Sequence, residues 1–559
     1  MLSELCKGIT KFSSNHALRL SLTKFSEICH RIRSNKYRAF TTNLYSSFVT
    51  ILIDSPKDEL IQEALYTAIC KIYPLLTPYA TEREIFDLMN AYLINLSSSL
   101  NSIRRYSSLS IVILCDSARK PDHYFNVALN HVANLMSTST KSIITENKDY
   151  LLTGIFMLAK CSFSKLAKYL DPNEHPKLFD SLLKNLSYIY QQMILTIKYA
   201  TNNILIIATL EALVEFFNAL PEKIFQMFTD LCEEEMEFKH ISSFRSSAMK
   251  SVINDSLMNL ENLNDEFEDE TFEKAGIFFS NAGSSLDLPD DVSEASESLF
   301  ANSLIENTGS IFDHESEIDT KSIENKTPEF DLSSEASSLN TTSHKCPNSP
   351  FDISSSFDLI ITENHLHSID FDDFNLGPLF SFEYAGKLIC LKYLLKVRPG
   401  QLMTDAEVRV AIKGLSLSCI ASIVQHCPRI LFEKLAYKKT ATQLIRDIFS
   451  FSTHSDPNIR GHMAMIVGKY LKRALSYSFS YDEFLAQNNP VGNNNNELSL
   501  DFLLNLLEKF LFDSSSITIR QTLISLQQFL PILIAHNEIR IIQIFNLIHQ
   551  LIRLKDNSY

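Results

Sequence analysis

Tryptophan is absent from this 559-residue sequence, and glycine is scarce at 12 residues. About 7% glycine is ordinary, and folds that cradle phosphates or dinucleotides depend on glycine-rich turns. The sequence contains no GxGxxG, GxxxxGKS/T, GxSxG or HExxH motif, so the signatures of the common nucleotide-binding, hydrolase and zinc-protease folds are missing. We therefore expect no enzyme, no cofactor and no small-molecule substrate.

Paired cysteines and an export signal are missing as well. The ten cysteines are isolated, without a CxxC pair or a histidine at zinc-finger spacing, so no metal site is expected. The first twenty residues break every apolar stretch after one or two positions, which argues against a secretory signal. These absences predict reduced core cysteines and a cytoplasmic location, with the nucleus as a further location.

Strict alternation of the strand type is rare, whereas apolar residues recur at three- and four-residue spacing, as at Leu88, Tyr92 and Leu96. This period is typical of amphipathic helices, so we predict an all-α protein. Its predicted parts are an amphipathic leader (1–14), a first helical block (15–260), an acidic serine-rich disordered linker (261–378) and a second helical block (379–559).

The formal charge of −15 is unevenly distributed. Between residues 261 and 376, 27 acidic residues stand against four basic ones, a net charge of −23, and the rest of the chain carries +8. The acidic segment is typical of disorder, and the whole-chain charge gives no indication of nucleic-acid binding. A tethered segment of this charge is expected to lie transiently on basic ridges of the helical blocks. Thr327 and Ser349 each precede proline and are candidate phosphorylation sites, where added charge would strengthen that contact.

A repeated sequence unit organises the helical blocks. In each copy a polar turn, often with Asp, precedes a β-branched residue and an Arg that opens an apolar helix. The defining positions are Arg104 in the first block and Asp405 with Arg409, Asp456 with Arg460 and Asp513 with Arg520 in the second, while Gln62 stands at the Arg position of a degenerate copy. The 42 residues from Gln62 to Arg104 match a HEAT unit, and the later spacings of 51 and 60 residues imply inserted loops.

Each residue type in this unit has a physical role. Asp can cap the helix at its positive end, the β-branched residue faces the core, and Arg can reach the capping Asp of an adjoining repeat. Stacked copies therefore predict a ladder of Asp and Arg side chains within a HEAT-repeat α-solenoid. Any single copy would be ordinary capping chemistry, so the prediction depends on the four copies with Arg.

Several segments resemble the N-terminal HEAT region of the huntingtin family. The main ones are 89–125, which includes SIRRYSSLSIVILC, 394–435, and 441–471, which includes DPNIRGHMAMIVGKYL, and weaker likeness covers 15–32 and 202–228. The order of helical block, acidic gap and helical block is similar too. No polyglutamine or proline-rich tract follows the first residues, and the chain stops at Tyr559, before the bridge and second array that the resemblance implies. A fragment or a truncated relative is therefore expected.

The first residues form an amphipathic pattern. Leu2, Leu5, Ile9 and Phe12 would share one face of a helix. This resembles the short leader of the family and implies a face for peripheral membrane or partner contact. The alternative is that this segment is the first helix of the array and packs on its neighbour.

The resemblance implies a non-enzymatic scaffold that organises protein complexes for vesicle and microtubule-based transport and for autophagy. The expected partners are proteins: the huntingtin-associated protein of forty kilodaltons and motor adaptors. The alternative is a HEAT adaptor resembling nuclear transport receptors, which take basic cargo on acidic inner helices. The +8 balance of the helical blocks counts against that alternative.

Overall fold

The structure is a computed structural model. It describes residues 1–55, 57–139, 145–169, 176–220, 374–396, 400–437, 441–477, 481, 484–485 and 498–536, with scattered positions from 542 to 553. All of these belong to one compact unit. Most of the predicted linker, with Thr327 and Ser349, lies outside the described residues, as does the predicted end of the first block at 221–260.

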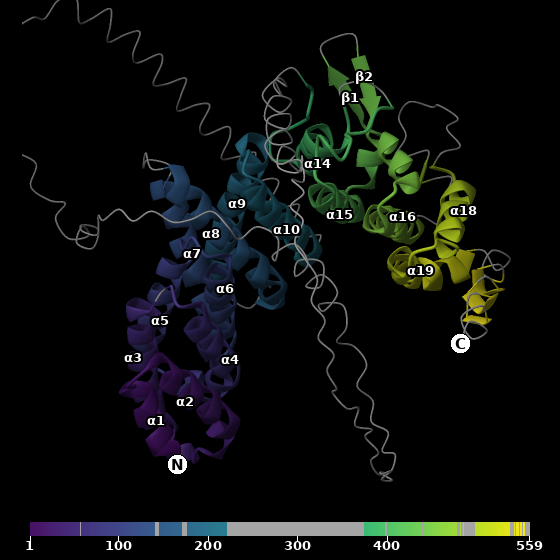
Figure 1. The fold of residues 1–559 in the computed structure, drawn as a ribbon. Coiled ribbons are helices and arrows are strands. Elements are labelled where there is room, and N and C mark those ends of the chain that lie inside the picture. The colour runs from purple at the N-terminus through teal and green to yellow at the C-terminus, as the bar shows by residue number, and fades with distance from the viewer. Residues whose placement is uncertain are drawn as a thin grey trace, which may run out of the picture. The chain divides into compact units, whose positions relative to one another are not determined.

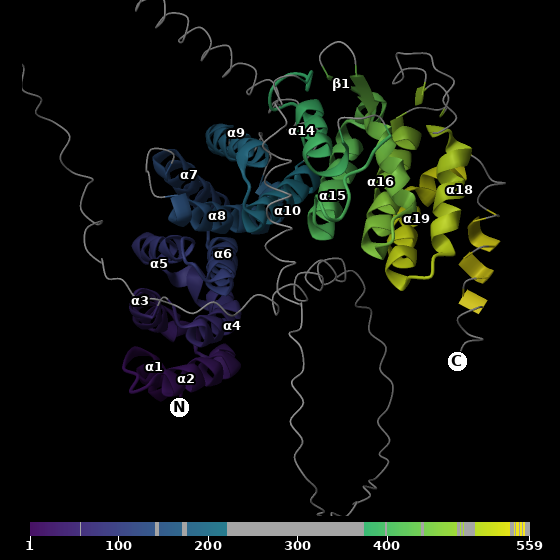
Figure 2. The same ribbon diagram turned by 45° about the horizontal axis from the view of Figure 1, so that its top comes forward.

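The described N-terminal half is a series of helices that pair in chain order (Figure 1). They are α1 (Leu2–Thr10), α2 (Asn15–Ile28), α3 (Tyr37–Asp54), α4 (Glu59–Leu76), α5 (Glu82–Asn95), α6 (Asn101–Asp116), α7 (Pro121–Ser139), α8 (Thr145–Leu166), α9 (Pro176–Tyr199) and α10 (Asn203–Ala219). Four short 3-10 turns lie between these helices: η1 (Cys29–Arg31) and η2 (Ser34–Lys36) after α2, η3 (Thr77–Tyr79) after α4 and η4 (Ala167–Tyr169) after α8. In Figure 2 the pairs α1–α2, α3–α4 and α5–α6 lie as successive layers.

Local sequence sets several helix starts. The Asp58 carboxylate accepts a hydrogen bond from the backbone N–H of Ile61 at the start of α4. Thr81 and Glu84 form a reciprocal capping box at the start of α5. Such caps satisfy backbone donors that the first turn of a helix leaves unpaired.

The second helix of each pair forms one row, and the first helices form another. In the first row α2 packs against α4, α4 against α6, α6 against α8 and α8 against α10. In the other row α1 packs against α3, α3 against α5 and α7 against α9. Such stacking of helix pairs is the HEAT-repeat α-solenoid, so the predicted fold class is confirmed.

The described C-terminal half continues this pattern with one irregular pair. Its elements are α14 (Phe382–Ile389), the π-helical η7 (Cys390–Leu394), α15 (Val410–His426), η8 (Pro428–Phe432), β1 (Lys434–Tyr437), β2 (Ala441–Leu444), the 3-10 helix η9 (Ile445–Thr453), α16 (Pro457–Tyr477), α18 (Leu500–Leu511) and α19 (Ser516–His536). Strands β1 and β2 pair antiparallel in a small hairpin. This hairpin was not predicted, and with η8 and η9 it takes the place of the first helix ahead of α16.

The two halves form one continuous array. Helix α10 packs against α15, α15 against α16 and α16 against α19, while α14 contacts α9. Residues 221–373 are therefore an insertion between neighbouring helix pairs. The predicted linker end at 378 lies too late, because Phe374 and Leu376 are already buried.

Helix α1 packs inside the array. Ile9 is fully buried, and Leu2, Leu5 and Phe12 are partly buried against the core. The helix contacts both α2 and α3. The face considered for membrane or partner contact is thus occupied by neighbouring helices, as in the alternative stated above.

Helix α19 is apolar enough to resemble a membrane span. Its stretch Ser516–Ile534 passes the length and composition criteria, and 33% of it is buried. Core helices of soluble arrays pass the same criteria. Here α19 packs against α16 and α18 as the second helix of a pair.

Candidate functional site

The residue at the Arg position of the repeat binds the turn that precedes its own helix. Gln62 Nε2 donates to the carbonyl of Ser55 at 3.0 Å. Arg104 Nη1 donates to the carbonyls of Ser98 and Ser99 at 2.5 and 3.0 Å. Gln62 and Arg104 are both buried, and buried carbonyls need such donors. This shared role explains why Gln can stand in place of Arg.

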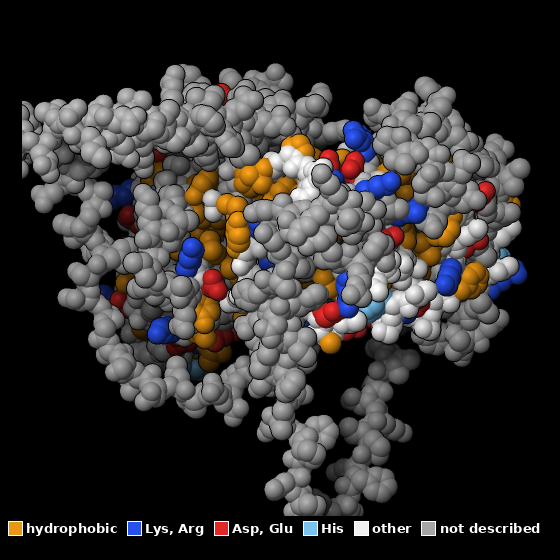
Figure 3. Space-filling model, turned by 90° about the horizontal axis from the view of Figure 1, so that it is seen from above, with side chains coloured by type: hydrophobic (Ala, Val, Ile, Leu, Met, Phe, Trp, Pro, Cys, Tyr) orange, Lys and Arg blue, Asp and Glu red, His pale blue; other side chains and the backbone are white. Residues whose placement is uncertain are grey.

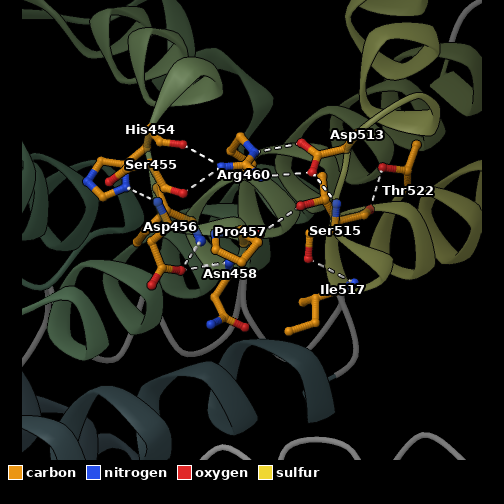
Figure 4. A network of polar contacts seen from close by, with 12 residues as sticks. His454, Ser455, Asp456, Pro457, Asn458, Arg460, Asp513, Ser515, Ile517 and Thr522 are labelled. Atoms are coloured by element: carbon orange, nitrogen blue, oxygen red, sulfur yellow. Dashed lines mark hydrogen bonds and ion pairs between the residues drawn. The ribbon is translucent and has the colours of Figure 1, made fainter.

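Arg460 adds a contact between repeats (Figure 4). Its Nη1 donates to the carbonyls of His454 and Ser455, at 2.7 and 2.8 Å, in the turn before α16. Its Nε and Nη2 donate to the two carboxylate oxygens of Asp513 at 2.6 and 2.8 Å. This hydrogen bonding lowers the pKa of Asp513. The predicted contact from Arg to the Asp of the adjoining repeat is therefore present here.

The Asp residues of these two repeats also bond to backbone at the start of a helix. Asp456 Oδ1 accepts from the backbone N–H of Asn458 at 2.7 Å. Asp513 Oδ1 accepts from the backbone N–H of Ser515 at 2.8 Å, just before α19. Asp513 thus accepts hydrogen bonds both from its own turn and from Arg460 of the preceding repeat.

Asp405 is held by different partners from those predicted. Lys413, fully buried on α15, donates from Nζ to Asp405 Oδ1 at 2.6 Å. His454 Nε2, in the following repeat, lies 3.1 Å from the same oxygen. Burial opposes ionisation, but the hydrogen bond and charge of Lys413 lower the pKa of Asp405. Arg409 is the N-cap residue of α15. The residue of this helix that contacts Asp405 is Lys413, one turn further along.

Two other Arg positions depart from the ladder. Arg104 reaches the adjoining repeat through an aromatic ring, with its Cζ 5.3 Å from the centroid of Tyr150 on α8. Arg520 is exposed and makes no ion pair within the described part of the chain. The prediction of one uniform Asp and Arg ladder is thus wrong at Arg104, whereas the repeat that would follow Arg520 lies largely outside the described residues.

Polar contacts between consecutive second helices are made instead by shorter side chains. Each joins the start of one second helix to the start of the next. They are Asn15 to Asp58 at 2.9 Å, Ser102 to Glu59 at 2.7 Å and Asn202 to Asp149 at 3.2 Å. The sequence pattern missed them because none contains Arg.

A buried lysine joins the two halves across the insertion. Lys392 is 2% exposed, and its Nζ donates to the carbonyls of Ile197, Lys198 and Ala200 at 2.5, 3.0 and 3.1 Å. These carbonyls lie at the C-terminal end of α9, which favours positive charge. Burial nevertheless lowers the pKa of Lys392 to about 8.

A second buried lysine lies at the junction of α10, α15 and α16. Lys469 Nζ donates to Asn218 Oδ1 at 2.7 Å and lies 3.2 Å from Ser422 Oγ. Ser422 also donates to Asn218 Oδ1 at 2.9 Å. Burial lowers the pKa of Lys469 to about 8, and nearby Glu215 partly opposes this. We call Lys392, Lys469, Asn218 and Ser422 the joint.

The joint was missed at the sequence level. The only signal is a lysine inside an apolar stretch, CLKYLL around Lys392 and IVGKYL around Lys469. A charge in such a stretch indicates a specific buried partner. The partner itself lies more than 190 residues away in the chain for Lys392.

These polar contacts position the helices and turns of the array. Within the described residues no group of three or more His, Cys, Asp and Glu could hold a metal ion. The described cysteines are free thiols, most of them buried. The polar groups brought together here hold helix ends and turns in place.

The stacked helix pairs and their polar contacts define a HEAT-repeat α-solenoid protein. Models of "Huntingtin, N-terminal HEAT 1" and "Huntingtin, N-terminal HEAT" match residues 1–120 and 451–559. The chain is 31% identical over 154 residues to huntingtin of Takifugu rubripes, 28% of this chain and 5% of that protein. It is 32% identical over 109 residues to the HD protein homolog of Dictyostelium discoideum, 20% of this chain and 4% of that protein. Both models and both relatives are of the huntingtin family, and these matches span only a small part of this chain and of either relative.

Solved structures that the chain matches include one from work on tubulin recruitment by microtubule polymerases with tumor overexpressed gene domain arrays. It is 9% identical, covers 94% of both chains and has a TM-score of 0.24. The karyopherin Kap121p bound to Nup53p is 12% identical over 94% of this chain and 45% of that one, with a TM-score of 0.22. At these TM-scores neither overlay carries an argument about function.

Proposed function

We propose that this chain is a non-enzymatic scaffold that binds other proteins along its HEAT array. The observation that carries the proposal is the unbroken row of second helices from α2 to α19, fixed at the joint by Lys392 and Lys469. A stacked array offers an extended surface on which several partners can bind at fixed spacing. A fixed joint would hold partners on the two halves at a constant separation.

Similarity to the huntingtin family supports a more specific proposal. We infer that the assemblies serve vesicle and microtubule-based transport and autophagy, in the cytoplasm and also in the nucleus. The proposed partners are the huntingtin-associated protein of forty kilodaltons and motor adaptors. The matched segments cover only a few per cent of the relatives' length. These partners are therefore proposed only for the part of the array that this chain contains.

Affinity capture of the tagged full chain from its own cells, followed by mass spectrometry, tests the proposal. We expect motor adaptors and the forty-kilodalton protein among the captured proteins. A variant with Lys392→Met and Lys469→Met should lose partners that touch both halves, whereas Lys472→Met, an exposed lysine of α16, should retain them. Capture of nuclear transport factors alone would instead favour the transport-receptor alternative.

A further inference from the structure

Exposed cations are concentrated on the turn between α2 and α3. Arg31, Arg33 and Lys36 are all exposed within six consecutive residues. Arg31, Arg33 and Lys36 make no ion pair with any described residue. Ile32, between them, is 5% exposed and belongs to the core. Ile32 therefore anchors the turn to the core, while the cations of the turn are exposed to solvent.

The end of α4 and the turn between α6 and α7 extend this group of cations. The backbone carbonyl of Lys71 lies 3.8 Å from Cys29 Sγ at the end of α2. The Tyr37 and Tyr79 rings lie 4.9 Å apart, and Arg119 lies over the Tyr79 ring at 6.0 Å. We define the basic edge as six exposed cations: Arg31, Arg33 and Lys36 ahead of α3, Lys71 on α4, and Arg119 and Lys120 between α6 and α7.

Three carboxylates near the basic edge are engaged by other cations. Those pairs are Glu27 with Lys24, Glu84 with Arg38 and Asp87 with Arg83. The positive charge of the basic edge is therefore not cancelled by them. On the face shown in Figure 3, by contrast, basic and acidic side chains are interspersed.

We propose that the basic edge is the docking surface for the acidic insert of the same chain, residues 261–373. The insert contains 27 acidic and four basic residues, so its charge is complementary to the edge. The insert is joined through the chain to the array at both ends, after α10 and before Phe374. Tethering keeps the local concentration of carboxylates high. The insert thus shields the edge from other acidic ligands, whichever partners bind elsewhere on the array.

Zero-length carbodiimide crosslinking of the purified full chain tests this proposal. The reagent joins lysines to carboxylates in direct contact, so Lys36, Lys71 and Lys120 act as reporters. At low salt we expect mass spectrometry to find crosslinks from these lysines to residues 261–373. The variant with Arg31→Gln, Arg33→Gln and Arg119→Gln keeps every reporter lysine, and its crosslinks should fall about fivefold, as expected for three exposed charge contacts.

The matched control removes three exposed cations of the other half, with Lys472→Gln, Lys509→Gln and Arg520→Gln. It should leave the crosslinks to Lys36 and Lys71 unchanged, and 0.5 M salt should suppress them in every variant. Equal crosslinking of the insert to Lys472 and Lys509 in the wild-type chain would overturn the proposal. Flotation of the wild-type chain on phosphatidylserine vesicles, without crosslinks to the insert, would assign the edge to a membrane surface instead.

Discussion

Buried cations distinguish this array at the residue scale. Arg104, Lys392, Lys413 and Lys469 are each no more than 7% exposed, although lysine and arginine are rarely buried without a partner. Arg104 and Lys392 donate to backbone carbonyls at turns and helix ends, where the α-helical pattern leaves acceptors unpaired. A buried charge adds little net stability, but removing its partner is costly. These residues therefore specify which helices meet.

Replacing Arg460 by Met should destabilise the array. It removes the Arg460 donors from the carbonyls of His454 and Ser455 and from both carboxylate oxygens of Asp513, of which Oδ1 keeps the N–H of Ser515. The expected loss is about 2–4 kcal/mol, since hydrogen bonds to charged groups contribute roughly 1.5–3 kcal/mol each. Urea denaturation of the full chain measures it, with the exposed Arg520→Met as control. Equal midpoints for the two variants would contradict the assigned role of Arg460.

The contacts of Glu407 with Lys396 and Thr404 are expected to be sensitive to acid. Glu407 pairs with Lys396 at 2.7 Å and accepts from the backbone N–H of Thr404 at 2.7 Å. Burial alone would raise its pKa, but these contacts lower it to about 2. The stability from this group is complete above about pH 4.5 and is lost as the pH falls toward 2. Glu407→Gln should therefore flatten the fall in thermal stability below pH 4.5, whereas Glu63→Gln, at an exposed site, should not.

At the scale of helices and strands, the features that depend on neighbouring residues in the chain could be predicted from the sequence. The helical period and the Asp and Arg turns were predictable, because caps and turns depend on residues close in the chain. The contact from Arg460 to Asp513, 53 residues apart, was predictable because the same unit recurs along the sequence. The β1–β2 hairpin was not predicted, since KLAY and ATQL are too short to show a strand period. The joint was not predicted because the partners of Lys392 lie on a helix before the insertion.

The approach of α16 to α19 depends on Gly468. A Cβ at this position would lie 2.5 Å from the Cβ of Ser525, closer than side-chain carbons approach. Gly468→Ala should destabilise the chain by about 1–3 kcal/mol, since overpacking displaces neighbouring groups. Ser525→Gly in the same chain should recover part of this loss. Thermal unfolding of both variants measures the effect, and the exposed Lys472→Ala on α16 controls for helix propensity. Failure of Ser525→Gly to restore stability would place the clash elsewhere.

At the scale of the whole molecule, insertion and array have separate roles. The array is continuous without residues 221–373, because α9 and α10 pack directly on α14 and α15. Residues 261–373 carry −23 within a chain of −15, so the net charge describes neither part. Long insertions are tolerated when their ends leave and return at neighbouring elements, since the entropy of closing a loop grows slowly with its length.

Cleavage within the insert should therefore leave the two halves associated. A protease site placed near residue 300 would yield two pieces that still share the contact of α10 with α15 and the joint. We expect them to elute together in gel filtration at micromolar concentration. Lys392→Met with Lys469→Met should weaken this association about five- to thirtyfold, because the α9 carbonyls and Asn218 lose donors worth about 1–2 kcal/mol in total. Lys472→Met, on the exposed face of α16, should have no effect. Separate elution of the wild-type pieces would show that the insert, and not the packed helices, holds the array together.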